Sequence, residues 1–101
     1  MEVVVSLFRE QLRGRLADVR EVYRTYYTGP LIRYAEGADE NGFLSAGAFS
    51  GRDDMEIGVF GNEDRITLVS RFDNLGKGAS GAAIECMNLV TGAEKTLGLE
   101  L

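Results

Sequence analysis

Apolar and polar residues alternate along two stretches in the second half of the chain. The first covers residues 55–59, the second covers residues 65–72, and the turn sequence Gly61-Asn62-Glu63-Asp64 lies between them. Alternation with a period of two is typical of β-strands, and a short polar turn joins antiparallel neighbours. We therefore expect an antiparallel hairpin over residues 55–72.

The first third of the chain predicts a strand, a helix and a second strand. Val3–Leu7 is rich in valine and is followed by another apolar residue, so we expect a strand buried on both faces. From Leu16 to Tyr27, apolar residues recur every three or four positions, which predicts an amphipathic helix closed by Gly29-Pro30. A short strand follows over residues 31–34.

The last helix begins in an unusual way. It is expected from about Gly78 to Gly92 and carries Gly78 and Gly81 near its start. Glycine in a helix costs roughly 1 kcal/mol against alanine, so something must come close to the backbone there. Small residues also share one face: Ala79, Ala82, Ala83 and Cys86. Two explanations stay open, namely close packing within the fold, or a cofactor or anionic group facing the positive end of the helix.

The order of these elements predicts the fold class. Residues 36–42 are acidic and contain glycine, which predicts an exposed loop, and residues 42–52 predict an irregular segment with room for one strand pairing. A chain of 101 residues suits a single domain. We expect an α+β fold of order β-α-β-(irregular)-β-β-α, in which a mixed, mostly antiparallel sheet carries two helices on one face.

The composition limits the kinds of partner and compartment. A net charge of −5 argues against nucleic-acid binding, which needs clustered Lys and Arg against phosphates. The single cysteine rules out an internal disulfide and favours a reducing, cytoplasmic location. The apolar run after Met1 is too short for a signal peptide or a membrane span, so we expect no membrane partner.

The residues alone predict no catalytic group and no metal site. The sequence has no histidine, so Cys86 has no partner to form a thiolate pair, and we expect it to be a buried packing residue. Asp53, Asp54 and Glu56 could hold a divalent cation, but without calcium-loop spacing we favour a charged group at the hairpin edge. Gly76–Gly81 satisfies the bare G-x-G-x-x-G pattern outside the context that a nucleotide site requires.

The polar turn and the last helix resemble a known signature. Asp73–Leu89 resembles D-N-L-x-K-G-[AS]-[AS]-G-Q-A-[VI]-Q-N-M-N-L, near the C-terminus of N-acetyl-gamma-glutamyl-phosphate reductases. Thr96–Leu99 is similar to the family's T-T-G-L ending, and the tyrosine-rich helix is similar to its L-R-E-x-Y-x-x-F-Y segment. Further residues fall, without gaps, where the family shows S-T-K-x-V-x-G-x-N-x-C-D-I-G-V: Ser45, Gly51, Ile57, Gly58 and Val59. The chain departs from the family at Gly47, Asp53, Ala82, Glu85 and Cys86.

The resemblance implies a C-terminal fragment of an NADP-dependent oxidoreductase of arginine biosynthesis, which converts N-acetyl-gamma-glutamyl phosphate to N-acetylglutamate 5-semialdehyde. Residues 1–72 would be the later part of its substrate and dimerisation domain, which forms a homo-oligomer through the sheet. The helix over residues 76–92 would return to a missing N-terminal nucleotide-binding domain. The catalytic cysteine and histidine would also precede residue 1, so the fragment alone would be inactive and would not bind NADP tightly.

The same resemblance implies a cofactor contact at the turn. The pair Asp73-Asn74 resembles the D-N pair of glyceraldehyde-3-phosphate dehydrogenase, in which the asparagine meets the nicotinamide carboxamide. We therefore expect Asn74 near the nicotinamide, with Lys77 and Gly78 close to it. The alternative is a free-standing α+β dimerisation or interaction module without catalysis, whose small-residue helix packs on its own sheet.

Overall fold

The computed structural model describes all residues, 1–101. Its helices and strands follow the expected order: β1 (Glu2–Phe8), α1 (Leu16–Tyr26), β2 (Ile32–Tyr34), β3 (Met55–Gly61), β4 (Arg65–Phe72) and α2 (Gly81–Thr91). A π-helical turn over Gly76–Ser80 precedes α2. Neither helix has the length and apolar character needed to cross a lipid bilayer.

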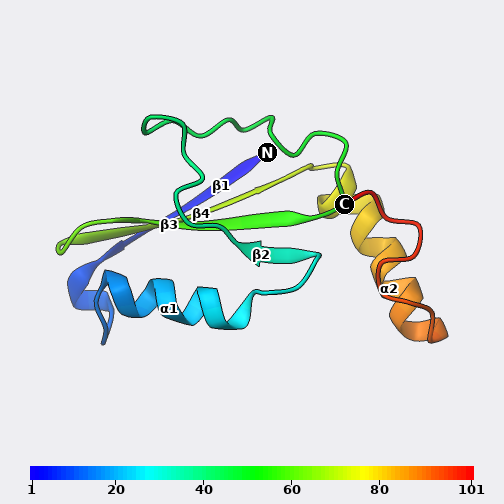
Figure 1. The fold of residues 1–101 in the computed structure, drawn as a ribbon, viewed down its shortest axis with the longest axis horizontal. Helices are drawn as coiled ribbons and strands as arrows, with labels where there is room; N and C mark the ends of the chain where they lie inside the picture. Colours follow the sequence, from blue (N-terminus) through cyan, green and yellow to red (C-terminus); the bar gives the residue numbers. More distant parts are fainter.

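The four strands form one mixed sheet in the order β1-β4-β3-β2 (Figure 1). β4 pairs antiparallel with both β1 and β3, whereas β2 runs parallel to β3. The Oδ1 atom of Asn62 accepts hydrogen bonds from the backbone N–H groups of Asp64 (2.8 Å) and Arg65 (3.0 Å), which closes the turn between β3 and β4. The α+β fold and the hairpin over residues 55–72 are therefore confirmed.

α1 lies along one face of the sheet, against β3 and β2 (Figure 1). The carboxylate of Asp18 accepts a hydrogen bond from the backbone N–H of Arg15 (2.8 Å), which satisfies a free donor at the start of the helix. Tyr23 and Tyr27 are half-buried and stack with their ring centroids 5.5 Å apart. Tyr26 is 77% exposed. Of the tyrosines in α1 and at its C-terminal cap, Tyr23 and Tyr27 are therefore partly covered, whereas Tyr26 lies at the surface.

β1 is the edge strand of the sheet, and the expectation that it is buried on both faces was wrong. Val3, Val4 and Val5 are 38%, 52% and 47% exposed. β1 pairs on one side only, with β4, and α1 lies over β2 and β3 at the other edge. A valine-rich strand satisfies the sequence pattern of a central strand, but its place in the sheet decides how much of it is covered.

α2 stands beyond one end of the sheet, so the expectation of two helices on one face was wrong (Figure 1). The helix ends as predicted, at Gly92, which adopts the left-handed conformation (φ 74°). The C-terminal segment then returns along the helix, and the buried side chain of Asn88 donates hydrogen bonds to the carbonyl oxygens of Lys95 (3.1 Å) and Leu97 (2.9 Å). α2 is thus held by its own turn and this returning segment.

The long segment between β2 and β3 lies on the sheet face opposite α1 (Figure 1). It is irregular, as expected, with one bridge between Glu40 and Phe43. At its end, Asp54 is fully buried (0% exposed), so the prediction of a hairpin-edge charge group was wrong. The reason is that Arg33 and Arg52 both reach this carboxylate, and a buried charge is tolerated when it is paired.

Candidate functional site

Asp73 organises the turn that leads from β4 to the last helix. Its Oδ1 atom accepts hydrogen bonds from the backbone N–H groups of Leu75 (2.8 Å) and Gly76 (3.3 Å), and its Oδ2 atom accepts one from Gly51. The bond from Gly51 contributes most, and together these donors hold the pKa of Asp73 below its usual range. The turn is therefore fixed by one ionised side chain, which accepts hydrogen bonds from the turn itself and from Gly51 in the long loop before β3.

Asn74 and Gly78, two of the residues expected near a cofactor, lie close together at this turn. The side chain of Asn74 makes no hydrogen bond within the chain and is exposed. A Cβ atom on Gly78 would lie 3.6 Å from Oδ1 of Asn74 and 3.4 Å from the ring of Phe72, which are ordinary contacts. The turn thus presents a free amide beside a backbone position that no other part of the chain requires to be glycine.

The glycines at positions 76 and 81 have a different explanation, which lies within the chain. A Cβ atom on Gly76 would clash with the carbonyl oxygen of Arg52, and one on Gly81 would clash with Oδ1 of Asp53 and lie 2.8 Å from its Cγ. Close packing, one of the two explanations left open by the sequence, therefore accounts for Gly81. The segment that packs there comes from the end of the long loop before β3.

Most backbone donors at the start of the helix are already used. Gly78 donates to the carbonyl oxygen of Asp73 (3.0 Å), Ser80 donates to that of Leu75 (3.1 Å), and Gly81 donates to that of Gly76. A helix start binds anions through free N–H groups. Because these groups are occupied, the start of the helix offers a ligand the side chain of Asn74 and the bare surface of Gly78.

Lys77, the third expected cofactor residue, points toward α2. Its Nζ atom lies 2.6 Å from Oε2 of Glu85, and the two side chains are only 11% and 16% exposed. Lys95 approaches the other carboxylate oxygen at 3.6 Å. The hydrogen bond from Lys77 contributes most to holding the pKa of Glu85 below its usual range, against the opposing effect of burial. The Lys77 ammonium is therefore engaged in an ion pair within the chain, whereas the amide of Asn74 is exposed.

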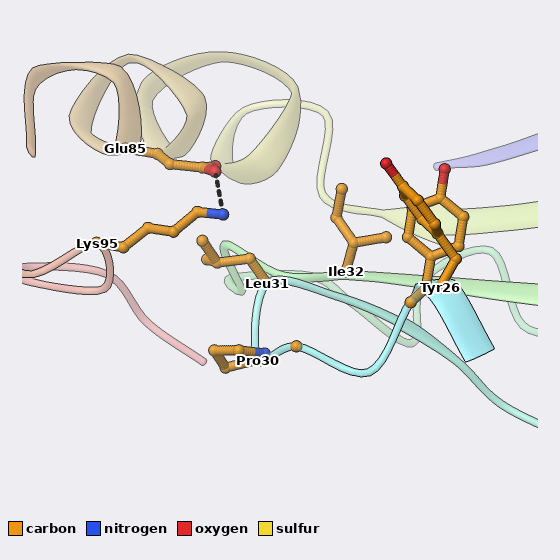
Figure 2. A pocket seen from close by; sticks show the side chains of 8 residues that line it. Tyr26, Pro30, Leu31, Ile32, Glu85 and Lys95 are labelled. Atoms are coloured by element: carbon orange, nitrogen blue, oxygen red, sulfur yellow. Dashed lines mark ion pairs between the residues drawn. The ribbon is translucent and has the colours of Figure 1, made fainter. Parts of the chain in front are cut away.

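Glu85 and Lys95 also line a cavity of about 250 Å³ between the end of α1 and α2 (Figure 2). Pro30, Leu31 and Ile32 line it from the other side, next to Tyr26, and Tyr27 also belongs to its lining. Sequence reasoning missed this cavity, because the return of the C-terminal segment brings its walls together from three distant parts of the chain. The cavity therefore has an apolar wall on one side and the ion pair of Lys95 with Glu85 on the other, so its charges are already matched within the chain.

Cys86 is exposed, so the expectation that it is a buried packing residue was wrong. It lies on the small-residue face expected from the sequence, on which Ala83 of α2 and Ala79 of the preceding π-helical turn are also exposed. Ala82, the fourth residue of this face, is half-buried, and no strand covers the rest of the face because α2 stands beyond the end of the sheet (Figure 1). No three His, Cys, Asp or Glu side chains are grouped so as to hold a metal ion.

The sequence is similar to curated proteins from three Brucella species. N-acetyl-gamma-glutamyl-phosphate reductases of Brucella ovis (strain ATCC 25840 / 63/290 / NCTC 10512), Brucella canis (strain ATCC 23365 / NCTC 10854 / RM-666) and Brucella abortus (strain S19) are each 42% identical to it over 99 residues. The match covers 91% of this chain and 32% of each relative, in the relative's C-terminal part. This chain is homologous to the C-terminal part of the N-acetyl-gamma-glutamyl-phosphate reductases. No protein-family model matches it.

The homology to these reductases confirms the resemblance noted in the sequence. The chain spans about a third of the length of the reductases that it matches. Because the match covers 91% of the chain, the shared part includes most of the sheet together with the turn and α2. Within that shared part, three surface features have no explanation in intramolecular contacts: the amide of Asn74, the bare position of Gly78, and the exposed outer face of α2, which is formed by Met87, Leu89 and Val90.

Proposed function

We propose that this chain acts as the C-terminal part of an NADP-dependent reductase. That enzyme converts N-acetyl-gamma-glutamyl phosphate to N-acetylglutamate 5-semialdehyde in arginine biosynthesis. The observation that carries the proposal is the 42% identity to reductases of that name over 91% of the chain. The chain alone supplies no histidine as a general base, so in this proposal the nucleophile and base come from the rest of the enzyme.

The turn after β4 supports a role beside the nicotinamide. A carboxamide needs a partner that both donates and accepts a hydrogen bond, and the free side-chain amide of Asn74 does both. Gly78 lets a flat ring approach the backbone next to that amide. In this proposal Lys77 lies close to the cofactor but does not bind it. Its ammonium is paired with Glu85, and this ion pair holds the π-helical turn against α2.

The outer face of α2 supports a nucleotide-binding domain as partner. Met87, Leu89 and Val90 are 57%, 60% and 87% exposed, beside the small side chains of Ala83 and Cys86. Apolar and small residues gathered on one exposed face are typical of an interaction surface. We assign this face to the nucleotide-binding domain of the complete reductase, where close packing would bring the turn to the cofactor.

The sheet edge supports a homo-oligomer as well. Val3 and Val5 line an apolar groove of about 220 Å³ between β1 and α1, together with Tyr23 and Leu68. An uncovered apolar edge strand is suited to bind a second copy of the same surface. In this proposal the second copy covers the valines that the chain leaves exposed.

A chimera tests the proposed function. The C-terminal third of the Brucella ovis reductase is replaced by this chain, and oxidation of NADPH is measured with N-acetyl-gamma-glutamyl phosphate as substrate. The chimera is expected to turn over, and the isolated chain is expected to show only background. A chimera that folds and binds NADPH but does not turn over would refute the proposal, as would turnover by the isolated chain.

A further inference from the structure

Two arginines meet on one buried carboxylate where β2 joins β3. The Nη1 atom of Arg33, on β2, lies 2.7 Å from Oδ2 of Asp54. Arg52 binds the same carboxylate with two atoms, Nε at 2.8 Å from Oδ1 and Nη2 at 2.6 Å from Oδ2. Because Asp54 is fully buried, its carboxylate is fixed in place and restrains both guanidinium groups that it binds.

The ring of Phe49 also packs against the same two guanidinium groups. The Cζ atoms of Arg52 and Arg33 lie 4.8 Å and 6.0 Å from the ring centroid of Phe49. Phe49 is itself only 4% exposed and therefore immobile. Arginines usually lose side-chain freedom when they bind a ligand, but here that freedom is already lost in the folded chain.

Both arginines keep unused donors that face solvent. Their side chains are 37% and 38% exposed, and neither makes a hydrogen bond or ion pair to any protein group other than Asp54. Each guanidinium has five N–H donors. Arg33 and Arg52 carry two positive charges and share the single carboxylate of Asp54. Glu56 also acts electrostatically on Arg52, but its own ion pair is with Arg71, so neither Arg33 nor Arg52 has a carboxylate to itself.

Arg71 is a third arginine over the ring of Phe49, and it serves as a comparison because all of its surroundings are protein groups. Its Nε and Nη2 atoms donate to Oε1 of Glu56 (3.1 and 2.6 Å), its Nη1 atom donates to the carbonyl oxygen of Ser45 (3.2 Å), and its side chain is 10% exposed. Arg71 is enclosed and its charge is neutralised by one carboxylate. Arg33 and Arg52 share one carboxylate and remain open.

We propose that Arg33 and Arg52 form an oxyanion-binding site for the phosphate or carboxylate group of a small molecule. Planar guanidinium groups bind such groups through paired N–H donors. The site adjoins the turn of the candidate functional site, because Gly51 donates to Asp73 and the backbone of Arg52 packs on Gly76. The inference rests on the chain's own geometry and does not require the proposed reductase function.

The test is a titration of the full chain with inorganic phosphate and, separately, with glutarate, at constant ionic strength near neutral pH. The Nε–H signals of the arginines are followed by NMR. Saturable shifts are expected for Arg33 and Arg52. Arg33→Lys and Arg52→Lys keep the charge that Asp54 needs but lose the fork of donors, so each should weaken binding at least about tenfold. Arg65→Lys is the matched control, since Arg65 has no ion pair, and it should bind like the parent chain.

The two anions distinguish the sources of the oxyanion. Tighter binding of phosphate assigns the site to a phosphorylated ligand, and tighter binding of glutarate assigns it to a carboxylate; either result supports the proposal. If the signals of Arg33 and Arg52 shift linearly with anion concentration, and by the same amount as the signal of Arg65, the proposal is overturned. Such shifts would report general screening of charge and not binding at one site. The titration of the parent chain decides this even if one variant fails to fold.

Discussion

The ammonium of Lys77 and the carboxylate of Glu85 lie 2.6 Å apart in a largely buried ion pair that joins the π-helical turn to α2. Eight positions separate the two residues, so an unbroken helix would not make them neighbours at the usual spacing of three or four. The ion pair therefore depends on the π-helical turn that precedes α2. It fixes the turn that carries Asn74 and Gly78 relative to the helix whose outer face is exposed.

Loss of this ion pair should destabilise the chain. Lys77→Met leaves Glu85 with only the more distant Lys95, so we expect a loss of about 1–3 kcal/mol in the free energy of unfolding, measured with urea. Arg24→Met is the control, because it removes an exposed arginine whose side chain is 46% exposed and should cost at most about 1 kcal/mol. Equal losses for the two variants would contradict this role of the buried pair.

Asp54 should make stability depend on pH. Burial raises the pKa of Asp54, but the hydrogen bonds from Arg52 and Arg33 outweigh burial and hold the pKa below its usual range. A carboxyl whose pKa is lower in the folded state stabilises the fold above its unfolded pKa of about 4, and this contribution is lost as pH falls through the folded pKa. Asp54→Asn should therefore be less stable than the parent near neutral pH, and the difference should shrink in acid. Urea unfolding at several pH values measures it, and a difference that stays constant would refute the assignment.

Two glycine substitutions should have opposite effects on stability. Gly81→Ala forces Cβ against the carboxylate of Asp53, so it should destabilise the chain although alanine is the better helix former. Gly78→Ala meets nothing closer than 3.4 Å and should be neutral or stabilising by up to about 1 kcal/mol. Thermal unfolding of the two variants compares them directly. Stabilisation by Gly81→Ala would show that the loop before β3 does not pack there.

Asn74→Ala should separate stability from cofactor use. The side chain makes no hydrogen bond within the chain, so the free energy of unfolding should change by less than about 0.5 kcal/mol. In the chimeric reductase the same change should raise the KM for NADPH about tenfold, which corresponds to one lost hydrogen bond pair to the carboxamide. An unchanged KM would remove Asn74 from the proposed nicotinamide site.

A charge on the outer face of α2 should disrupt assembly without unfolding the chain. Val90 is 87% exposed, so Val90→Lys should leave the unfolding of the isolated chain unchanged. In the chimera it should abolish activity, because a buried unpaired charge is costly at a closed interface. Val22→Lys is the matched control, since Val22 is 63% exposed on α1, and it should leave the chimera active. Full activity of the Val90 variant would show that α2 does not meet the nucleotide-binding domain.

The sequence by itself determined the elements and the family. Alternation marked the hairpin of β3 and β4, the three-to-four spacing marked α1, and Gly92 marked the end of α2, because these signals arise from residues near one another in the chain. The signature after β4 pointed to the reductases, and the homology confirmed it.

Tertiary structure alone decided which surfaces are covered. The valines of β1 and the thiol of Cys86 fit buried patterns but are exposed, because β1 is at the sheet edge and α2 stands beyond its end. Asp54 fits a surface pattern but is buried, because arginines from two separate segments reach it. A local pattern fixes the period of an element, whereas burial depends on contacts between distant segments, which no local pattern specifies.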